Sequence, residues 1–208
     1  MDLSSWLGDV YKRHPIASVT KMVTACYYLS NNYKLDRFKT ELFIDGVIKD
    51  SVLHGDLYLK GYGDPTLKTD DLSVFIDSIK NLGVNEVLGS LFYDNSYLPD
   101  INYINRNQLP QYAYNPGMGA INLNENRILF EWKRLEKAKY KTSLTAPGLK
   151  NIAQVTNITM DLENYKGPVY SYELDETKFK ERWSVNRRIL GKKGSRWLPV
   201  RESSYYAT

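Results

Sequence analysis

The chain has 208 residues, of which 42% are hydrophobic and 25% are charged, so we do not expect intrinsic disorder and the length allows a sizeable core. The net charge is only +4, and we see no module typical of nucleic-acid-binding proteins, so no nucleic-acid partner is expected. The basic residues of the second half are interpreted as solvated strand edges and turns. They are Lys133, Arg134, Lys137, Lys139, Lys141, Arg182, Arg187, Arg188, Lys192, Lys193, Arg196 and Arg201.

The composition gives no support for a zinc site, an intrachain disulfide or a membrane span. Cys26 is the only cysteine, and His14 and His54 are the only histidines, so a Cys/His zinc site lacks ligands and no intrachain disulfide can form. We therefore expect neither a metal nor a cofactor. The apolar runs are much shorter than the ~20 residues of a membrane helix, so no membrane span is expected. Met1 is followed by Asp2 without an apolar segment, so no signal peptide is expected within this chain.

The first predicted element is a helix from about Ser18 to Leu29, shortly after Pro15. Its apolar residues recur three and four positions apart, which indicates one apolar stripe. The stripe consists of Val19, Met22, Val23, Cys26 and Leu29. Two short strands should follow, over 38–44 and 56–60, with a turn at Gly46 between them.

Residues 69–82 carry the clearest helix pattern. Thr69 is expected to cap its N-terminus, and Gly83 lies just beyond its last residue. A buried stripe is expected at Leu72, Phe75, Ile76, Ile79 and Leu82. A strand from about Val84 to Tyr93 should follow. The polar stretch from Asp94 to Gly119 is predicted to be a long ordered loop. Such loops are often functional or wrap another element.

From Ile121 onward the pattern favours strands. Arg182 to Leu190 and Ser195 to Val200 are predicted to pair as a hairpin across residues 191–194. Residues 202–208 should begin a helix. The other strands are expected at 121–123, at 127–132 after a connection over 124–126, and at 154–162.

Ser18-Val19-Thr20-Lys21 is the candidate nucleophile motif. Residues three apart on a helix share a face, so the Lys21 amine can reach the Ser18 hydroxyl. A neutral lysine can accept the serine proton and so generate an acylating alkoxide. The spacing alone is weak evidence, because 15 serines and 18 lysines in 208 residues produce such a pair about once by chance.

A longer stretch around this motif is more specific. Residues 16–25, Ile-Ala-Ser-Val-Thr-Lys-Met-Val-Thr-Ala, resemble the segment around the acylated serine of D-alanyl-D-alanine carboxypeptidases of the DacB type, serine peptidases of the penicillin-binding class. Three later blocks resemble the same family, and together they extend the resemblance over nearly the whole chain. They are Gly55–Gly61 running into Gly63–Leu67, Ala120–Asn126, and Arg196–Arg201.

The resemblance implies an α+β fold in which a transpeptidase/β-lactamase-like domain is interrupted by a large, mainly β insertion. Residues 1–40 would be the first piece of the catalytic domain, residues 41–202 the insertion, and residues 203–208 the start of a truncated return helix. The later blocks would then be turn and strand devices inside the insertion.

The family completes its active site with a Ser-x-Asn motif and a Lys-Thr-Gly strand, both downstream of the insertion. No Lys-Thr-Gly occurs in this chain. Ser184-Val185-Asn186 matches the Ser-x-Asn pattern, but it lies inside the predicted hairpin, and the match is interpreted as coincidental. The chain is therefore expected to carry the nucleophile without the other half of the active site.

The resemblance implies a serine-type D-alanyl-D-alanine carboxypeptidase of the cell envelope or periplasm, with catalytic residues Ser18 and Lys21. Its expected partners are peptidoglycan stem peptides and β-lactams, if the site is completed, and a missing C-terminal half. The alternative is a non-catalytic remnant that binds wall peptides or a protein.

Overall fold

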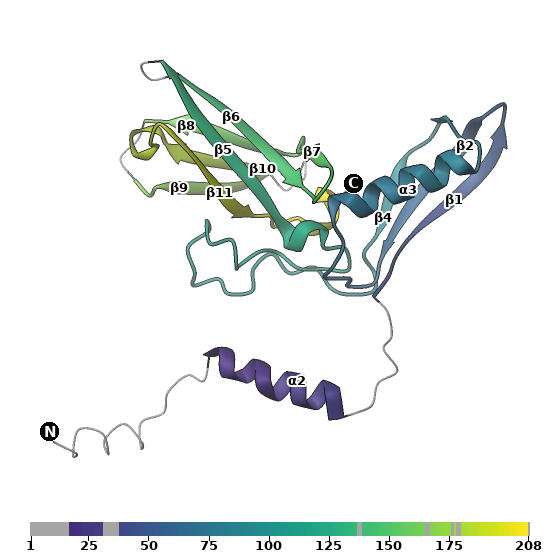
Figure 1. Cartoon of the computed structure of the whole chain (residues 1–208), viewed down its shortest axis with the longest axis horizontal. Coiled ribbons are helices and arrows are strands. Elements are labelled where there is room, and N and C mark those ends of the chain that lie inside the picture. The colour runs from purple at the N-terminus through teal and green to yellow at the C-terminus, as the bar shows by residue number, and fades with distance from the viewer. Residues whose placement is uncertain are drawn as a thin grey trace, which may run out of the picture. The chain divides into compact units, whose positions relative to one another are not determined.

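The computed structural model describes residues 17–30, 38–136, 139–164, 167–175, 177 and 180–207, and the chain forms two compact units, 1–37 and 38–208 (Figure 1). In the first unit, η1 (Ala17–Val19) is a turn of 3-10 helix that leads directly into α2 (Thr20–Ser30). The helix predicted over 18–29 is thus confirmed. Pro15 and His14 lie outside the described residues.

The second unit begins with a four-stranded sheet. β1 and β2 are antiparallel, and β3 and β4 both run parallel to β2. The strands are β1 (Thr40–Lys49), β2 (Val52–Gly61), β3 (Glu86–Val87) and β4 (Leu91–Asp94).

The turn expected at Gly46 is wrong, because Gly46 lies inside β1 and pairs with Gly55 of β2. The two strands turn instead at Asp50 and Ser51, whose φ values of 51° and 64° suit a two-residue hairpin loop. Glycine is needed within β1 because a Cβ on Gly46 would lie 2.4 Å from the backbone oxygen of His54. The glycine therefore marks a close approach of two strands, not a chain reversal.

α3 (Thr69–Asn81) confirms the helix predicted over 69–82, and Gly83 follows it with a φ of 82°. The expected cap is wrong: Lys68 occupies the cap position, and the buried Thr69 hydroxyl donates to Ala146 O at 2.8 Å. The stripe is only partly buried. Leu72, Phe75 and Ile79 are half-buried, whereas Ile76 and Leu82 are 52% and 60% exposed.

The single strand expected over 84–93 is divided into β3 and β4. Both keep one register against β2, with Glu86 opposite Val52 and Leu91 opposite Leu57. The interruption lies at Gly89, where a Cβ would meet the backbone oxygen of Gly55 at 2.0 Å. The long loop (residues 95–119) follows and forms neither helix nor strand, as expected.

The rest of the unit contains two further sheets, one with the order β11-β5-β6-β7 and one with the order β8-β10-β9. Two short helical turns, η2 (Leu123–Asn126) and η3 (Arg187–Ile189), connect the strands. The strands are β5 (Arg127–Glu136), β6 (Lys139–Pro147), β7 (Ile152–Gln154), β8 (Ile158–Glu163), β9 (Tyr170–Asp175), β10 (Lys180–Asn186) and β11 (Lys193–Pro199).

The hairpin predicted between 182–190 and 195–200 is wrong. β10 pairs with β8 and β9, whereas β11 pairs with β5 in the other sheet. The chain crosses between the sheets through η3 and the buried Leu190. The crossing lets apolar side chains of both sheets meet in one core, which a local hairpin would not bring about. The segment over 154–162 is likewise divided between β7 and β8.

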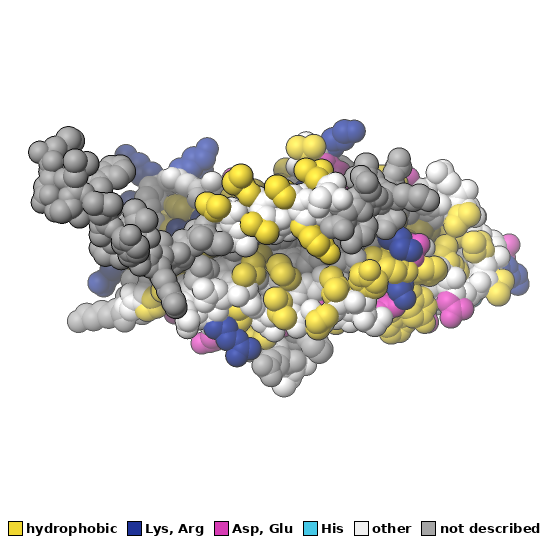
Figure 2. Space-filling model, turned by 90° about the horizontal axis from the view of Figure 1, so that it is seen from below, with side chains coloured by type: hydrophobic (Ala, Val, Ile, Leu, Met, Phe, Trp, Pro, Cys, Tyr) yellow, Lys and Arg dark blue, Asp and Glu magenta, His cyan; other side chains and the backbone are white. Residues whose placement is uncertain are grey.

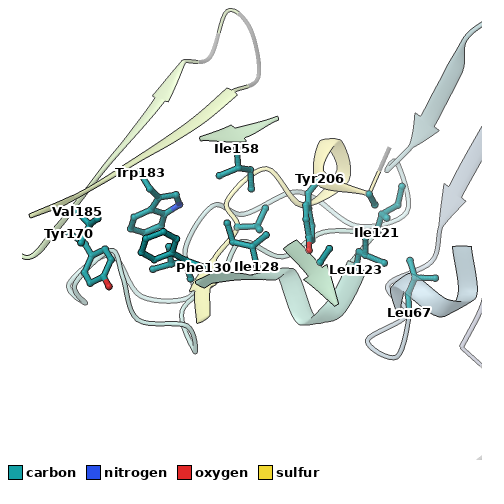
Figure 3. Close-up of a cluster of buried hydrophobic side chains, with 14 of the residues drawn as sticks. Leu67, Ile121, Leu123, Ile128, Phe130, Ile158, Tyr170, Trp183, Val185 and Tyr206 are labelled. Carbon is teal, nitrogen blue, oxygen red and sulfur yellow. The ribbon is translucent and has the colours of Figure 1, made fainter. Parts of the chain in front are cut away.

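One apolar core runs from the two packed sheets to the start of α3 (Figure 3). Phe130 from β5 and Trp183 from β10 are fully buried and lie side by side in this view. The cluster continues through Tyr206 and Ile121 to Leu67, just before α3. The two packed sheets (the sandwich) and the four-stranded sheet with α3 (the α3 sheet) therefore share one apolar core, and the fold is α+β as predicted.

α4 (Ser203–Tyr206) is the short helix expected near the end of the chain. Tyr206 is 7% exposed and donates its hydroxyl to Arg127 O at 3.0 Å. α4 thus packs into the core of the second unit. No helix in the described part of the chain is long and apolar enough to cross a membrane.

We expect Tyr206→Ala to lower the free energy of unfolding by about 3–5 kcal/mol, because it empties an aromatic position of the core. Tyr206→Phe keeps the ring and loses only the hydrogen bond, so it should cost about 1 kcal/mol. Urea denaturation of the full chain measures both. Tyr114→Ala, at a position 64% exposed, is the control, and an equal loss there would refute the packing of α4.

Asp70 should be the strongest polar tie between α3 and the sandwich. Its carboxylate accepts hydrogen bonds from three successive backbone N–H groups, those of Leu149, Lys150 and Asn151, at 2.6–3.2 Å. We expect Asp70→Asn to lower the melting temperature by several degrees, whereas Asp77→Asn on the exposed side of α3 should not. Differential scanning calorimetry distinguishes the two, and identical melting curves would contradict this role.

Candidate functional site

Ser18 lies in η1, two residues before α2 begins at Thr20, and Lys21 is the second residue of α2. The expected placement of Ser18 at the start of a helix is therefore confirmed. The two are three positions apart in helical chain, so they lie on neighbouring positions of one helical face. Both side chains are exposed. Their catalytic roles remain predictions.

The helix that carries these residues buries none of its described side chains. The apolar stripe expected from the sequence is present but uncovered, with exposed fractions of 59% for Val19, 66% for Met22 and 75% for Leu29. Figure 2 shows hydrophobic side chains exposed over much of the face that it views. An uncovered stripe of this kind is typical of a helix that packs against a further part of a fold.

Ser184-Val185-Asn186 forms part of β10 and is buried. The Ser184 hydroxyl donates to Glu163 Oε1 at 3.4 Å, and the Asn186 side chain accepts from the backbone N–H of Arg188 at 3.1 Å. These contacts serve the sheet, which agrees with the interpretation of the spelling as coincidental, although the predicted hairpin around it is wrong.

A second Ser-x-Asn spelling, Ser30-Asn31-Asn32, begins at the last residue of α2. Sequence analysis overlooked it, and Asn31 and Asn32 lie outside the described residues. Ser30 is 12 residues from Ser18, which corresponds to about 18 Å along a helix. Ser30 therefore cannot share a catalytic site with Ser18.

The Gly63–Leu67 block forms a tight turn. Gly63 has a φ of 78° and donates its N–H to Ala120 O at 2.7 Å. Asp64 accepts from the backbone N–H and from the hydroxyl of Thr66, at 2.8 and 2.6 Å. This block therefore joins β2 to α3, as the expected turn device.

The Ala120–Asn126 block forms the junction between the α3 sheet and the sandwich. Asn124, Glu125 and Asn126 all have φ values near +50°, a left-handed conformation that Asn tolerates better than most residues. Asn124 Nδ2 donates to the Thr69 hydroxyl at 2.8 Å, and Asn126 Nδ2 donates to Gly117 O at 2.9 Å. Contrary to expectation, residues 121–123 form no strand beyond a single bridge at Ile121.

A buried polar cluster was missed by the sequence analysis. Arg201 was grouped with solvated basic residues, but it is 2% exposed and its guanidinium donates to the carbonyls of Asn102, Pro110 and Asn115 in the long loop. Glu181 is fully buried nearby, and burial raises its pKa to about 7. Arg201 is the last residue of one of the family-like blocks, and this was the only sequence feature that could have indicated its buried role. No sequence feature indicated the burial of Glu181.

The long loop borders an apolar groove of about 640 Å³. Leu98, Ile101 and Met118 line it and remain 41–44% exposed. The loop is nevertheless firmly held, because Arg201 and Asn126 bind its carbonyl groups. Such an apolar hollow provides a surface for packing.

Within the described ranges, no three His, Cys, Asp or Glu side chains gather in a way that could hold a metal ion. Cys26 lies exposed on α2.

Comparison with known proteins places these features in a family. The model of the D-Ala-D-Ala carboxypeptidase 3 (S13) family matches residues 12–200, a range that includes Ser18, Lys21, the first two later blocks and all of the third except Arg201. The fold resembles the crystal structure of penicillin binding protein 4 (dacB) from Haemophilus influenzae, with a TM-score of 0.56 and 19% identity over 82% of this chain.

The match covers 38% of that solved chain, so this chain spans well under half the length of the relative. A structure of the same Haemophilus influenzae protein complexed with a novel β-lactam matches with a TM-score of 0.49 and 16% identity, over 82% of this chain and 35% of that one. The family match extends over most of the 208 residues, and the chain therefore belongs to the D-Ala-D-Ala carboxypeptidase 3 (S13) family.

Proposed function

We propose that this chain is the nucleophile-bearing part of a serine-type D-alanyl-D-alanine carboxypeptidase that hydrolyses peptidoglycan stem peptides. The observation that carries the proposal is the position of Ser18 at the start of a helix, three residues before Lys21, inside the segment that matches the family. By family membership we assign the enzyme to the cell envelope or periplasm.

In the proposed reaction the Lys21 amine removes the Ser18 proton while the serine oxygen attacks the carbonyl carbon of the penultimate D-alanine. The resulting oxyanion needs two converging donors, and the backbone N–H of Ser18 can supply one of them. The carbon–nitrogen bond then breaks, terminal D-alanine leaves with a proton, and an acyl-serine remains. Water hydrolyses this ester and restores the serine. β-Lactams would acylate the same oxygen by ring opening.

The described site lacks what this chemistry requires. A lysine has an ordinary pKa of about 10.4, and only a buried or strongly cationic environment lowers it toward neutrality. Lys21 has an exposed side chain on a helix that buries nothing. The second oxyanion donor comes, in the family, from the Lys-Thr-Gly strand, and residues 1–208 contain no such motif. We therefore propose that this chain is nearly inert alone and that a polypeptide with the remaining motifs completes it.

We further propose that residues 1–40 belong to the catalytic domain, residues 41–202 form the inserted region, and residues 203–208 begin the return to that domain. The uncovered stripe of α2 supports the first assignment, because the remainder of the catalytic domain would bury it. The core packing of α4 means that the return begins against the inserted region.

A non-catalytic remnant is the second candidate. The exposed Ser18 and Lys21 side chains favour it for the isolated chain, because a serine without a base or an oxyanion site gains no reactivity. Such a remnant would bind wall peptides or a protein. Acylation of the completed protein distinguishes the two.

Acylation by a fluorescent penicillin tests the nucleophile. We expect negligible labelling of the 208-residue chain alone, because loss of one oxyanion donor by itself costs about 100- to 1000-fold. Labelling should appear when a polypeptide carrying the Ser-x-Asn and Lys-Thr-Gly motifs is added. Peptide mass spectrometry should then locate the label on Ser18.

Ser18→Ala should abolish labelling of the completed protein, and Ser30→Ala, at the other end of α2, is the matched control. Labelling that survives Ser18→Ala would overturn the nucleophile assignment. Rapid stoichiometric labelling of the isolated chain would show instead that residues 1–208 hold a complete site.

Lys21→Arg tests the base. Arginine keeps the positive charge but cannot be deprotonated in a protein, so it cannot accept the serine proton. We expect acylation of the completed protein to slow by about 100- to 10,000-fold, the range of a lost general base. Lys49→Arg, at the exposed end of β1, should leave the rate unchanged. An undiminished rate in Lys21→Arg would exclude Lys21 as the base.

A further inference from the structure

β1 is the edge strand of the α3 sheet (Figure 1). In the described part of the chain it pairs only with β2, over all ten of its residues and without a register shift. Alternate residues of such a strand direct their backbone N–H and C=O groups away from the neighbouring strand. β1 contains neither a proline nor a bulge, which are two of the devices that keep an edge from pairing. It therefore presents its outer backbone groups to a further strand.

The side chains of β1 are apolar on both faces of the sheet. Leu42 and Ile48 lie opposite buried leucines of β2, and Phe43 and Val47 occupy the other face. The exposed fractions are 47% for Phe43, 68% for Val47 and 42% for Ile48. A long edge strand that exposes apolar side chains readily pairs with another strand. A strand added to β1 would remove apolar area from water on both faces and would complete the backbone hydrogen bonds.

The charges of β1 indicate which strand fits this edge. Glu41 and Asp45 lie in its first half, and Lys49 is its last residue. A second β1 that runs antiparallel brings Lys49 of each copy beside the acidic half of the other copy. A parallel second β1 in register would instead place like charges directly opposite one another, which is destabilising. The charge distribution therefore favours an antiparallel second copy of the same strand.

One antiparallel register matches the side chains well, namely the one in which Asp45 lies opposite its own copy. This like-charge pair occurs once, whereas the two-fold symmetry produces each of the other pairs twice. Cross-strand charge pairs are similar in magnitude, so two attractive pairs outweigh one repulsive pair. The pairs that occur twice are Glu41 with Lys49, Leu42 with Ile48, Phe43 with Val47, and Ile44 with Gly46.

The charged side chains of β1 are available for these contacts. Glu41 accepts hydrogen bonds from the Lys39 amine at 3.1 Å and from the Tyr62 hydroxyl at 2.6 Å, and a carboxylate has about four acceptor positions. Lys49 forms no ion pair with another described residue. Asp45 already lies opposite Asp56 in the sheet of one chain, so neighbouring carboxylates are part of this fold.

We propose that two copies of this chain associate through antiparallel pairing of their β1 strands, about a two-fold axis at Asp45. The two four-stranded sheets then become one continuous sheet. Addition of a strand to an exposed sheet edge is a recurrent mode of recognition, and two-fold dimers are the commonest closed assemblies. One strand from each copy buries less than the ~1,600 Å² of a standard interface, so the dimer is reversible. It does not depend on the proposed peptidase activity.

Sedimentation equilibrium of the full chain at low ionic strength tests the pairing. From about 1 to 300 µM we expect a monomer–dimer equilibrium that weakens as salt is added. Lys49→Glu and Glu41→Lys should each weaken the dimer about 10-fold, because two cross-strand pairs change from attraction to repulsion. The double variant Glu41→Lys/Lys49→Glu should dimerise like the unsubstituted chain, because the charges match again. Lys80→Glu, which makes the same charge change at the exposed end of α3, should have no effect.

Substitutions at Asp45 test the register. Asp45→Asn should strengthen the dimer, because it removes the like-charge pair at the axis. In a Cys26→Ser background, Asp45→Cys should form a disulfide-linked dimer under mild oxidation, because directly opposite antiparallel residues have Cα atoms about 4.5–5.5 Å apart, within disulfide range. Asp77→Cys, on the exposed side of α3, is the matched control and should cross-link much more slowly.

A chain that remains monomeric over the whole concentration range would overturn the proposal and leave this edge to a strand of another polypeptide. A dimer that is weakened by Lys49→Glu but not restored in the double variant would show that a different surface pairs, and so would equal cross-linking at positions 45 and 77. If Glu41→Lys does not fold, Lys49→Glu and Asp45→Cys still decide, because both replace exposed side chains.

Discussion

The left-handed turn at Asn124–Asn126 is the constraint on which the second unit depends. Three successive residues with positive φ reverse the chain just before β5, and asparagine side chains satisfy the backbone on both sides. Asn124 holds Thr69 at the start of α3, while Asn126 holds Gly117 of the long loop. The sheet with α3, the loop and the sandwich therefore meet at one hydrogen-bonded junction, and the apolar core continues through it.

The family-like blocks that meet at this junction have structural roles. The Gly63–Leu67 turn and the 120–126 segment position strands and helices, and their polar groups are used in local hydrogen bonds. The candidate nucleophile, Ser18, instead precedes a helix that buries none of its described side chains.

The long loop is ordered because its carbonyl groups are bound by a buried arginine. A loop of 25 residues without regular structure would ordinarily be mobile, but Arg201 gathers three of its carbonyls and Asn115 is buried within it. Holding the loop in this way requires that the Arg201 cation and the neighbouring carboxyl of Glu181 are buried. Such polar clusters are stable only when nearly every group is paired.

The sequence by itself determined the family, the helix near Ser18, α3 and the β-rich character of the second unit. These features depend on local periodicity and on short sequence motifs, which involve only residues close together in the chain. Tertiary structure decided the strand partners of β10 and β11, the place of Gly46 inside β1, and the burial of Arg201. Strand pairing and burial depend on residues distant in the chain, and an arginine looks the same in sequence whether solvent or three carbonyl groups receive its hydrogen bonds.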